Sequence, residues 1–186
     1  MATEPYVGFT GIVTPEDTYT AEICLLHLTP CTFPYRLMTG VLVSGKTLGG
    51  GTTTNRRYPT LAEAKNRVTE LEALGCWPAI HYNTSGIKDP LLDHPQKLTD
   101  AIPNNGIGIQ LNMANPDPDA MAEYRRLRPD RELILQVNDA RVTTTTKDIH
   151  DYVRRYKGIA SHALLDLSGG KGKELDEDWV IKVLMD

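Results

Sequence analysis

A phosphate-binding pattern lies between Gly40 and Thr47, where the chain matches GxxxxGK[ST] letter for letter. In a nucleotide-binding loop of this kind the four variable residues turn around the phosphates, and a helix starts at the lysine. Here the variable residues are Val-Leu-Val-Ser, which favour a strand. The next residues are Leu48-Gly49-Gly50-Gly51, and each glycine disfavours a helix by about 1 kcal/mol relative to alanine. We therefore expect a strand and then a non-helical loop over 45–59, and a P-loop nucleotide binder is the weaker interpretation.

Short apolar runs rich in β-branched residues alternate with segments of helical periodicity, which is typical of βα units in a parallel sheet. Near-continuous apolar runs at 133–135 and 163–165 indicate strands buried on both faces by outer helices. We predict strands at 6–12, 36–44, 77–82, 106–111, 132–137 and 161–167. Helices are predicted at about 14–28, 61–74, 90–102, 119–127 and 146–156, and from 178 onward.

Three motifs carry a resemblance to a known family. The first is Gly11-Ile12 followed by Pro15-Glu16-Asp17, the second is Asn55-Arg56-Arg57-Tyr58, and the third is Leu164-Leu165-Asp166 followed by Gly169-Gly170-Lys171-Gly172-Lys173 and Asp178-Trp179. In this order they resemble phosphoribosylanthranilate isomerase, with its C-G-I-T-x-x-E-D stretch, its S-x-R-Y segment, and its sixth strand, glycine-rich loop and DW-started helix. Ile109-Gln110-Leu111 is similar to the V-Q-L-H-G of the family's fourth strand.

The resemblance implies an α/β fold, a TIM-type (β/α) barrel with a parallel sheet and outer helices, of which six of eight βα units are recognisable. Residues 1–186 would form a single, partial barrel domain. The implied activity is an intramolecular, Amadori-type isomerisation of a phosphoribosylated aromatic amine, as in tryptophan biosynthesis. The family uses no cofactor, so we expect none, and no metal.

By resemblance, Asp166 is the general acid that opens the sugar ring, since it ends a strand where it can reach substrate. Arg57 would hold the substrate's carboxylate through a bidentate pair. The loop of Gly169, Gly170, Lys171, Gly172 and Lys173 would be a lid that excludes water. The alternatives are a loop-capping Asp, an exposed Arg in a polar loop and a plain glycine-rich connection.

Two substitutions depart from the family pattern. Thr10 occupies the position of the family's general base, a cysteine, and a hydroxyl replaces a thiolate poorly without a neighbouring base. Asn112 replaces the family's histidine at strand four and cannot titrate. His81, Asn83 and Asn138 follow other strands and are expected in an altered polar lining, although a single strand histidine is more often structural.

The strands that would be seventh and eighth are absent, and with them the family's phosphate-binding loops. The first and sixth strands would then have unpaired edges, which are an aggregation hazard. We expect a second copy of the chain, a partner subunit, or further residues of a longer chain to cover them.

Composition excludes several classes of protein. The net charge is -4, with no long basic run, which argues against a nucleic-acid binder. The N-terminus lacks the features of a signal peptide, and no apolar stretch reaches the roughly 20 residues of a membrane span. We therefore expect a cytoplasmic protein without membrane contact. The three cysteines, Cys24, Cys31 and Cys76, lack CxxC spacing, so we expect reduced thiols and no zinc cluster.

The leading hypothesis is an isomerase-type barrel enzyme for a small anionic substrate such as a sugar phosphate, with Asp166 as acid, Arg57 as anion clamp and an unidentified base. The alternative is a small-molecule-binding barrel that has lost its chemistry, which Thr10 and Asn112 favour. Both hypotheses require Thr10, Arg57 and Asp166 to meet at one rim of the barrel.

Overall fold

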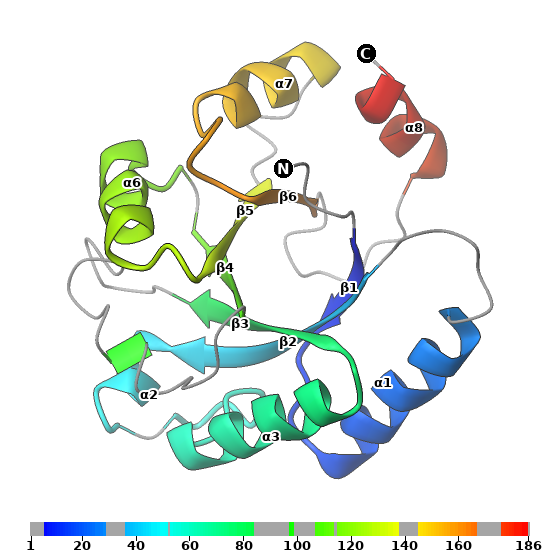
Figure 1. Ribbon diagram of the computed structural model, residues 1–186, viewed down its shortest axis with the longest axis vertical. Coiled ribbons are helices and arrows are strands. Elements are labelled where there is room, and N and C mark those ends of the chain that lie inside the picture. Colours follow the sequence, from blue (N-terminus) through cyan, green and yellow to red (C-terminus); the bar gives the residue numbers. More distant parts are fainter. Residues whose placement is uncertain are drawn as a thin grey trace.

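A computed structural model describes residues 6–28, 36–51, 53–83, 97–98, 107–113, 115–137, 145–166 and 176–185. Six strands form one sheet in the order β1-β2-β3-β4-β5-β6, and each neighbouring pair is parallel. The sheet curls about a central axis with the helices outside it, as Figure 1 shows. This is the predicted fold, a TIM-type arrangement of six βα units.

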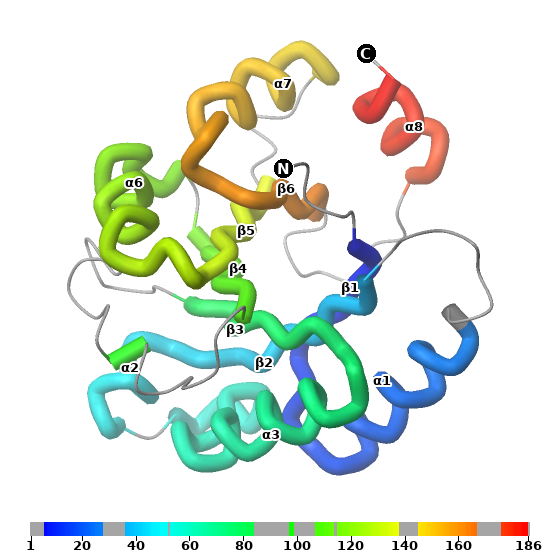
Figure 2. Tube along the Cα trace, in the orientation of Figure 1, coloured from blue at the N-terminus to red at the C-terminus, as the bar shows by residue number. Residues whose placement is uncertain are grey.

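Figure 2 traces the chain from blue to red: one helix follows each of β1, β4, β5 and β6, and two follow β2. The strands are β1 (Tyr6–Thr10), β2 (Arg36–Ser44), β3 (Trp77–Asn83), β4 (Gly108–Asn112), β5 (Glu132–Val137) and β6 (His162–Leu165). The helices are α1 (Pro15–Leu28), α2 (Gly45–Leu48), α3 (Leu61–Ala73), α6 (Pro118–Leu127), α7 (Thr146–Arg154) and α8 (Glu177–Met185). The helix expected over 90–102 lies outside the described residues, apart from Lys97 and Leu98, which are helical.

The four inner strands are buried on both faces, as the apolar runs predicted. Outward side chains such as Val41, Ile80 and Leu133 join a large apolar core with the helices. Inward side chains form a second cluster of Met38, Trp77, Ala79 and Ile134. The two faces are separate because successive side chains of a strand point in opposite directions.

The prediction of two-sided burial is wrong for residues 163–165, because β6 is an edge strand. Its residues are half-buried or exposed, and Val7 of β1, at the other edge, is 49% exposed. In the part of the chain that the structure describes, no strand pairs with the outer edge of either. Exposed apolar side chains also lie on the helices next to these edges: Tyr19, Ile23 and Leu26 on α1, and Ile181, Leu184 and Met185 on α8. What covers the edges stays a prediction.

Helix boundaries follow local hydrogen bonding. Thr60 and Glu63 form a reciprocal capping box at the start of α3, and Thr145 and Asp148 form another at α7. Gly75 and Gly158 adopt φ of +84° and +80° after these helices, which is the left-handed conformation that glycine accepts at no steric cost.

The prediction that 45–59 contains no helix is wrong for its first turn. Ser44 accepts a hydrogen bond from the Thr47 N–H through its side chain, and this cap starts the one-turn helix α2. The P-loop interpretation still fails, because Gly40 to Ser44 continue β2 rather than turn around an anion. Gly40 instead gives room to the neighbouring strand: a β-carbon there would lie 2.6 Å from Thr10 Cγ2.

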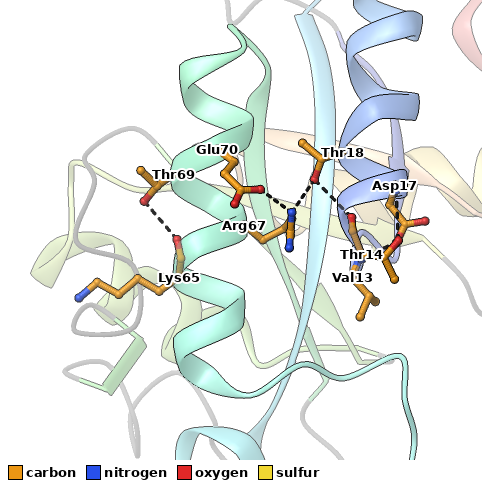
Figure 3. Close-up of polar contacts among 8 residues, drawn as sticks. All are labelled: Val13, Thr14, Asp17, Thr18, Lys65, Arg67, Thr69 and Glu70. Atoms are coloured by element: carbon orange, nitrogen blue, oxygen red, sulfur yellow. Dashed lines mark hydrogen bonds and ion pairs between the residues drawn. The ribbon is translucent and has the colours of Figure 1, made fainter.

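Polar contacts between α1 and α3 fix the start of α1 (Figure 3). Asp17 accepts hydrogen bonds from the N–H groups of Val13 (2.8 Å) and Thr14 (2.7 Å). Burial opposes ionisation of Asp17, but these hydrogen bonds outweigh it and lower the pKa of its carboxyl. Arg67 of α3 donates to Thr18 Oγ1 at 3.1 Å and pairs with Glu70. The segment after β1 is therefore held against the second βα unit.

No helix in the described ranges is both long enough and apolar enough to cross a membrane.

Candidate functional site

A cavity of about 370 Å³ opens at the carboxyl ends of the strands. Five residues predicted for the site line it: Thr10, Arg57, His81, Asn112 and Asp166. They come from four strands or strand ends and from the loop between α2 and α3. The carboxyl ends of parallel strands share one rim, which is where barrels of this type hold their ligands. The structure thus brings the five residues together, while their roles stay predictions.

Four further polar residues line the cavity. Gln110 of β4 and Gln136 of β5 were not predicted, although both interrupt apolar runs at positions facing the interior. The sequence signal was a polar residue inside each apolar run, and the strand pairing of the structure then aligns Gln110 with His81. Asn55 and Tyr58 belong to the Arg57 motif.

A chain of hydrogen bonds crosses β3, β4, β5 and the end of β6. Gln136 Nε2 donates to Asp166 Oδ2 at 2.9 Å. Gln110 Nε2 lies 3.5 Å from Gln136 Oε1 and 3.2 Å from His81 Nδ1. Gln110 is fully buried and Gln136 is 3% exposed. Their amides therefore take the place of water as hydrogen-bond partners of His81 and Asp166.

His81 is held uncharged at neutral pH. Burial, assisted by the positive charge of Arg57, lowers the pKa of its imidazole to about 4, and Asp166 opposes the shift. A ring with this pKa is almost unprotonated at pH 7 and is therefore a poor general acid.

Arg57 reaches the cavity from the loop that follows α2. Its backbone N–H donates to Asn55 Oδ1 at 3.0 Å, and the next residue, Tyr58, accepts a hydrogen bond from Asn83 Nδ2 through its hydroxyl. A β-carbon on Gly11 would lie 3.6 Å from Arg57 Nη2, so the guanidinium lies beside the end of β1. It is thus a cation at the same rim as Asp166.

The opposite end of the barrel interior holds a cluster that sequence reasoning missed. Arg36 forms a two-point pair with Glu132, with both N–O distances 3.2 Å. The Arg36 guanidinium lies 4.0 Å from the centre of the Trp77 ring, and the ring of His162 packs against Trp77 and Tyr6. The sequence signal was a charged or aromatic residue at the first position of each of five strands: Tyr6, Arg36, Trp77, Glu132 and His162.

Other predicted site residues lie outside the described residues: Gly169, Gly170, Lys171, Gly172, Lys173 and Asn138. In the described ranges, no three His, Cys, Asp or Glu side chains are grouped so that they could hold a metal ion.

Comparison with known proteins gives little beyond the fold. No family model matches the chain, and no curated protein matches it. Among solved structures, one described as a dihydrodipicolinate synthetase from Pseudomonas aeruginosa is similar, with 13% identity and a TM-score of 0.47. The alignment covers 80% of this chain and 45% of that one, so the chain spans less than half of that structure's length. So weak a likeness supports no function, and the resemblance to phosphoribosylanthranilate isomerase stays a prediction.

Proposed function

We propose that this chain carries the acid and anion-binding part of a β/α-barrel isomerase for a small anionic, sugar-derived substrate. The observation that carries the proposal is the shared cavity of Asp166 and Arg57 at the rim where such barrels bind ligands. A carboxyl and a guanidinium at one cavity suit proton transfer on one part of a substrate and recognition of an anion on another.

The reaction proposed is the one that the resemblance implies. A proton passes from the Asp166 carboxyl to the ring oxygen of a furanosylamine, and the bond between that oxygen and the anomeric carbon breaks. Ring opening leaves an iminium group at the anomeric carbon, and removal of the proton on the adjacent carbon gives an enolamine. Protonation of the anomeric carbon and loss of the enol proton then yield the aminoketose. Arg57 would bind the carboxylate of the aromatic amine during these steps. The base for the second step is altered, because Thr10 replaces the family's cysteine.

The test is turnover of phosphoribosylanthranilate, followed by the loss of its fluorescence. We expect slow turnover by the wild-type chain and a loss of at least about 100-fold in Asp166→Asn, in line with removal of a general acid. Thr10→Cys restores a thiol at the same rim and should raise the rate. Turnover that persists unchanged in Asp166→Asn would refute the assignment of the acid.

A non-catalytic binding protein is the second candidate. It is favoured by two uncharged side chains at the cavity, Thr10 and Asn112, at positions where the family has a thiol and an imidazole. This candidate predicts saturable binding of the substrate without fluorescence loss in the wild-type chain and in Thr10→Cys. Arg57→Gln should weaken that binding, because the anion loses its cationic partner.

A further inference from the structure

Two side chains that line the cavity each have a polar atom without a hydrogen-bond partner in the described part of the chain. His81 and Gln110 both line the cavity, and they are 8% and 0% exposed. Within the described residues, His81 Nε2 and Gln110 Oε1 are shielded from solvent and unpaired. Most buried polar groups in folded proteins are paired, since burial without a partner costs roughly 1–3 kcal/mol. Two such atoms on side chains that line one cavity are therefore suited to a ligand that enters it.

The chain of hydrogen bonds determines which ring nitrogen of His81 carries the proton. Gln136 Nε2 donates to Asp166 Oδ2, so the amide of Gln136 has its nitrogen toward that carboxyl oxygen and its own oxygen on the other side. The Gln136 oxygen is then the acceptor for Gln110 Nε2, whose other contact is His81 Nδ1. Because an amide nitrogen donates and does not accept, His81 Nδ1 must accept. The proton of the neutral ring is therefore on Nε2.

We propose that His81 donates a hydrogen bond from Nε2–H to an oxygen atom of a sugar-like ligand in this cavity, while Gln110 Oε1 accepts one from a hydroxyl of the same ligand. The inference rests on the proposed function, because it takes the ligand of that cavity to be sugar-derived. Sugar hydroxyls both donate and accept, so one class of ligand satisfies both atoms.

The charges around His81 favour donation over proton transfer. The charged groups lining the same cavity in the described residues are Arg57, from the loop after α2, and Asp166, at the end of β6. Burial and the positive charge of Arg57 lower the pKa of His81 and keep the ring uncharged, although Asp166 has the opposite effect. A neutral ring with Nδ1 occupied by Gln110 has its Nε2–H as the one donor available to a ligand. His81 is accordingly a ligand-binding residue and not the missing base.

Titration of the chain with ribose 5-phosphate by calorimetry tests the inference. His81→Phe keeps a planar ring and removes the donor, so we expect affinity to fall about tenfold, the value of roughly one hydrogen bond. His81→Gln keeps an N–H donor and should stay within about threefold of wild type. His27→Phe, on the exposed side of α1, is the matched control and should bind as wild type does. Circular dichroism establishes that each variant is folded.

The outcomes separate this inference from the proposed function. If wild type binds and His81→Phe binds equally well, the inference is overturned while the proposed function stands. If wild type does not bind ribose 5-phosphate, the inference is overturned, whereas the proposed function is decided separately by the turnover of phosphoribosylanthranilate. Nitrogen-15 NMR of the ligand-free chain gives an independent result: protonated Nε2 and unprotonated Nδ1 at pH 7 support the inference, and the opposite tautomer overturns it.

Discussion

The two ends of the barrel interior differ in how they are filled: one is packed with side chains, and the other contains a cavity. At the amino ends of the strands, the Arg36–Glu132 ion pair and the rings of Tyr6, Trp77 and His162 fill the space. At the carboxyl ends, neutral amides connect Asp166 to His81 around a cavity of about 370 Å³. The filled end contributes packing and charge pairing to stability, whereas the hollow end has groups placed for a ligand.

An unpaired atom alone does not distinguish the two ends. Tyr6 OH and Arg36 Nε at the filled end also lack partners, but both side chains are packed against the Trp77 ring. His81 Nε2 differs because its side chain lines an open cavity. Function is therefore inferred from the combination of an unsatisfied atom and accessible space.

The largest expected effect is at the filled end. Trp77 is 7% exposed, and Trp77→Ala removes the ring on which Tyr6, Arg36 and His162 pack. We expect the free energy of unfolding to fall by about 3–5 kcal/mol, measured by urea denaturation. Tyr19→Ala, an aromatic residue that is 63% exposed, should change it by less than about 0.5 kcal/mol. Equal effects of the two variants would contradict the packing described.

The next effect is a pH dependence at the hollow end. The pKa of His81 is about 4 in the folded chain and 6.5 in the absence of the protein environment. Between these values the unfolded state binds a proton that the folded state does not, so stability falls as the pH drops from 6.5 toward 4. The loss is at most about 3 kcal/mol and levels off below pH 4. His81→Phe lacks this contribution, so its free energy of unfolding should depend less on pH between 6.5 and 4. If urea denaturation shows the same pH dependence for wild type and His81→Phe, the lowered pKa of His81 is refuted.

A smaller effect is expected from the ion pair. Arg36 and Glu132 side chains are 29% and 23% exposed, so the pair is partly hydrated. Arg36→Met removes the guanidinium from the Glu132 carboxylate and leaves it beside His162 Nδ1, 3.2 Å away. We expect a cost of about 2 kcal/mol, between the values for exposed and buried pairs. The double variant Arg36→Met/Glu132→Leu should recover most of that loss. A double variant less stable than Arg36→Met would show that the pair has a further role.

The smallest effect concerns the amide connection. Gln136→Met removes the donor to Asp166 and the acceptor for Gln110 at nearly constant volume. We expect about 1 kcal/mol of destabilisation and an affinity for ribose 5-phosphate reduced about threefold, because the Gln110 amide is then free to reverse. The His81 tautomer, followed by nitrogen-15 NMR, should become mixed. A single, unchanged tautomer would show that Gln136 does not direct the chain of hydrogen bonds.

Strands buried on both faces were the best predicted part of the fold. The predicted bounds of β2 and β5 agree with those observed, because a continuous apolar run marks a strand covered on both sides. β1 is shorter than predicted, because it ends before Gly11, whose φ is +99°. β6 extends from His162 to Leu165, and position 167 of the predicted strand lies outside the described residues. α2 was missed because a single side-chain cap at Ser44 outweighed the glycines that follow it.

The site was predicted where it depends on strand ends and missed where it depends on register. The family resemblance placed Thr10 and Asp166 at strand ends, and parallel topology brings such ends to one rim. Gln110 and Gln136 are within strands, and only the pairing of β3, β4 and β5 reveals that they connect His81 to Asp166. The cluster at the other end joins strands distant in sequence, such as β2 and β5, and no local pattern encodes such a contact.

The close packing of Gly40 under Thr10 couples the evolution of two positions. Any side chain at position 40 would have its β-carbon within 3.1 Å of the Thr10 Cα, Cβ and Cγ2 atoms. A descendant that gained even a methyl group at position 40 would have to respace the first two strands, and with them the rim residue at position 10. Substitutions at position 10 are thus constrained by the requirement for glycine at position 40 on the neighbouring strand.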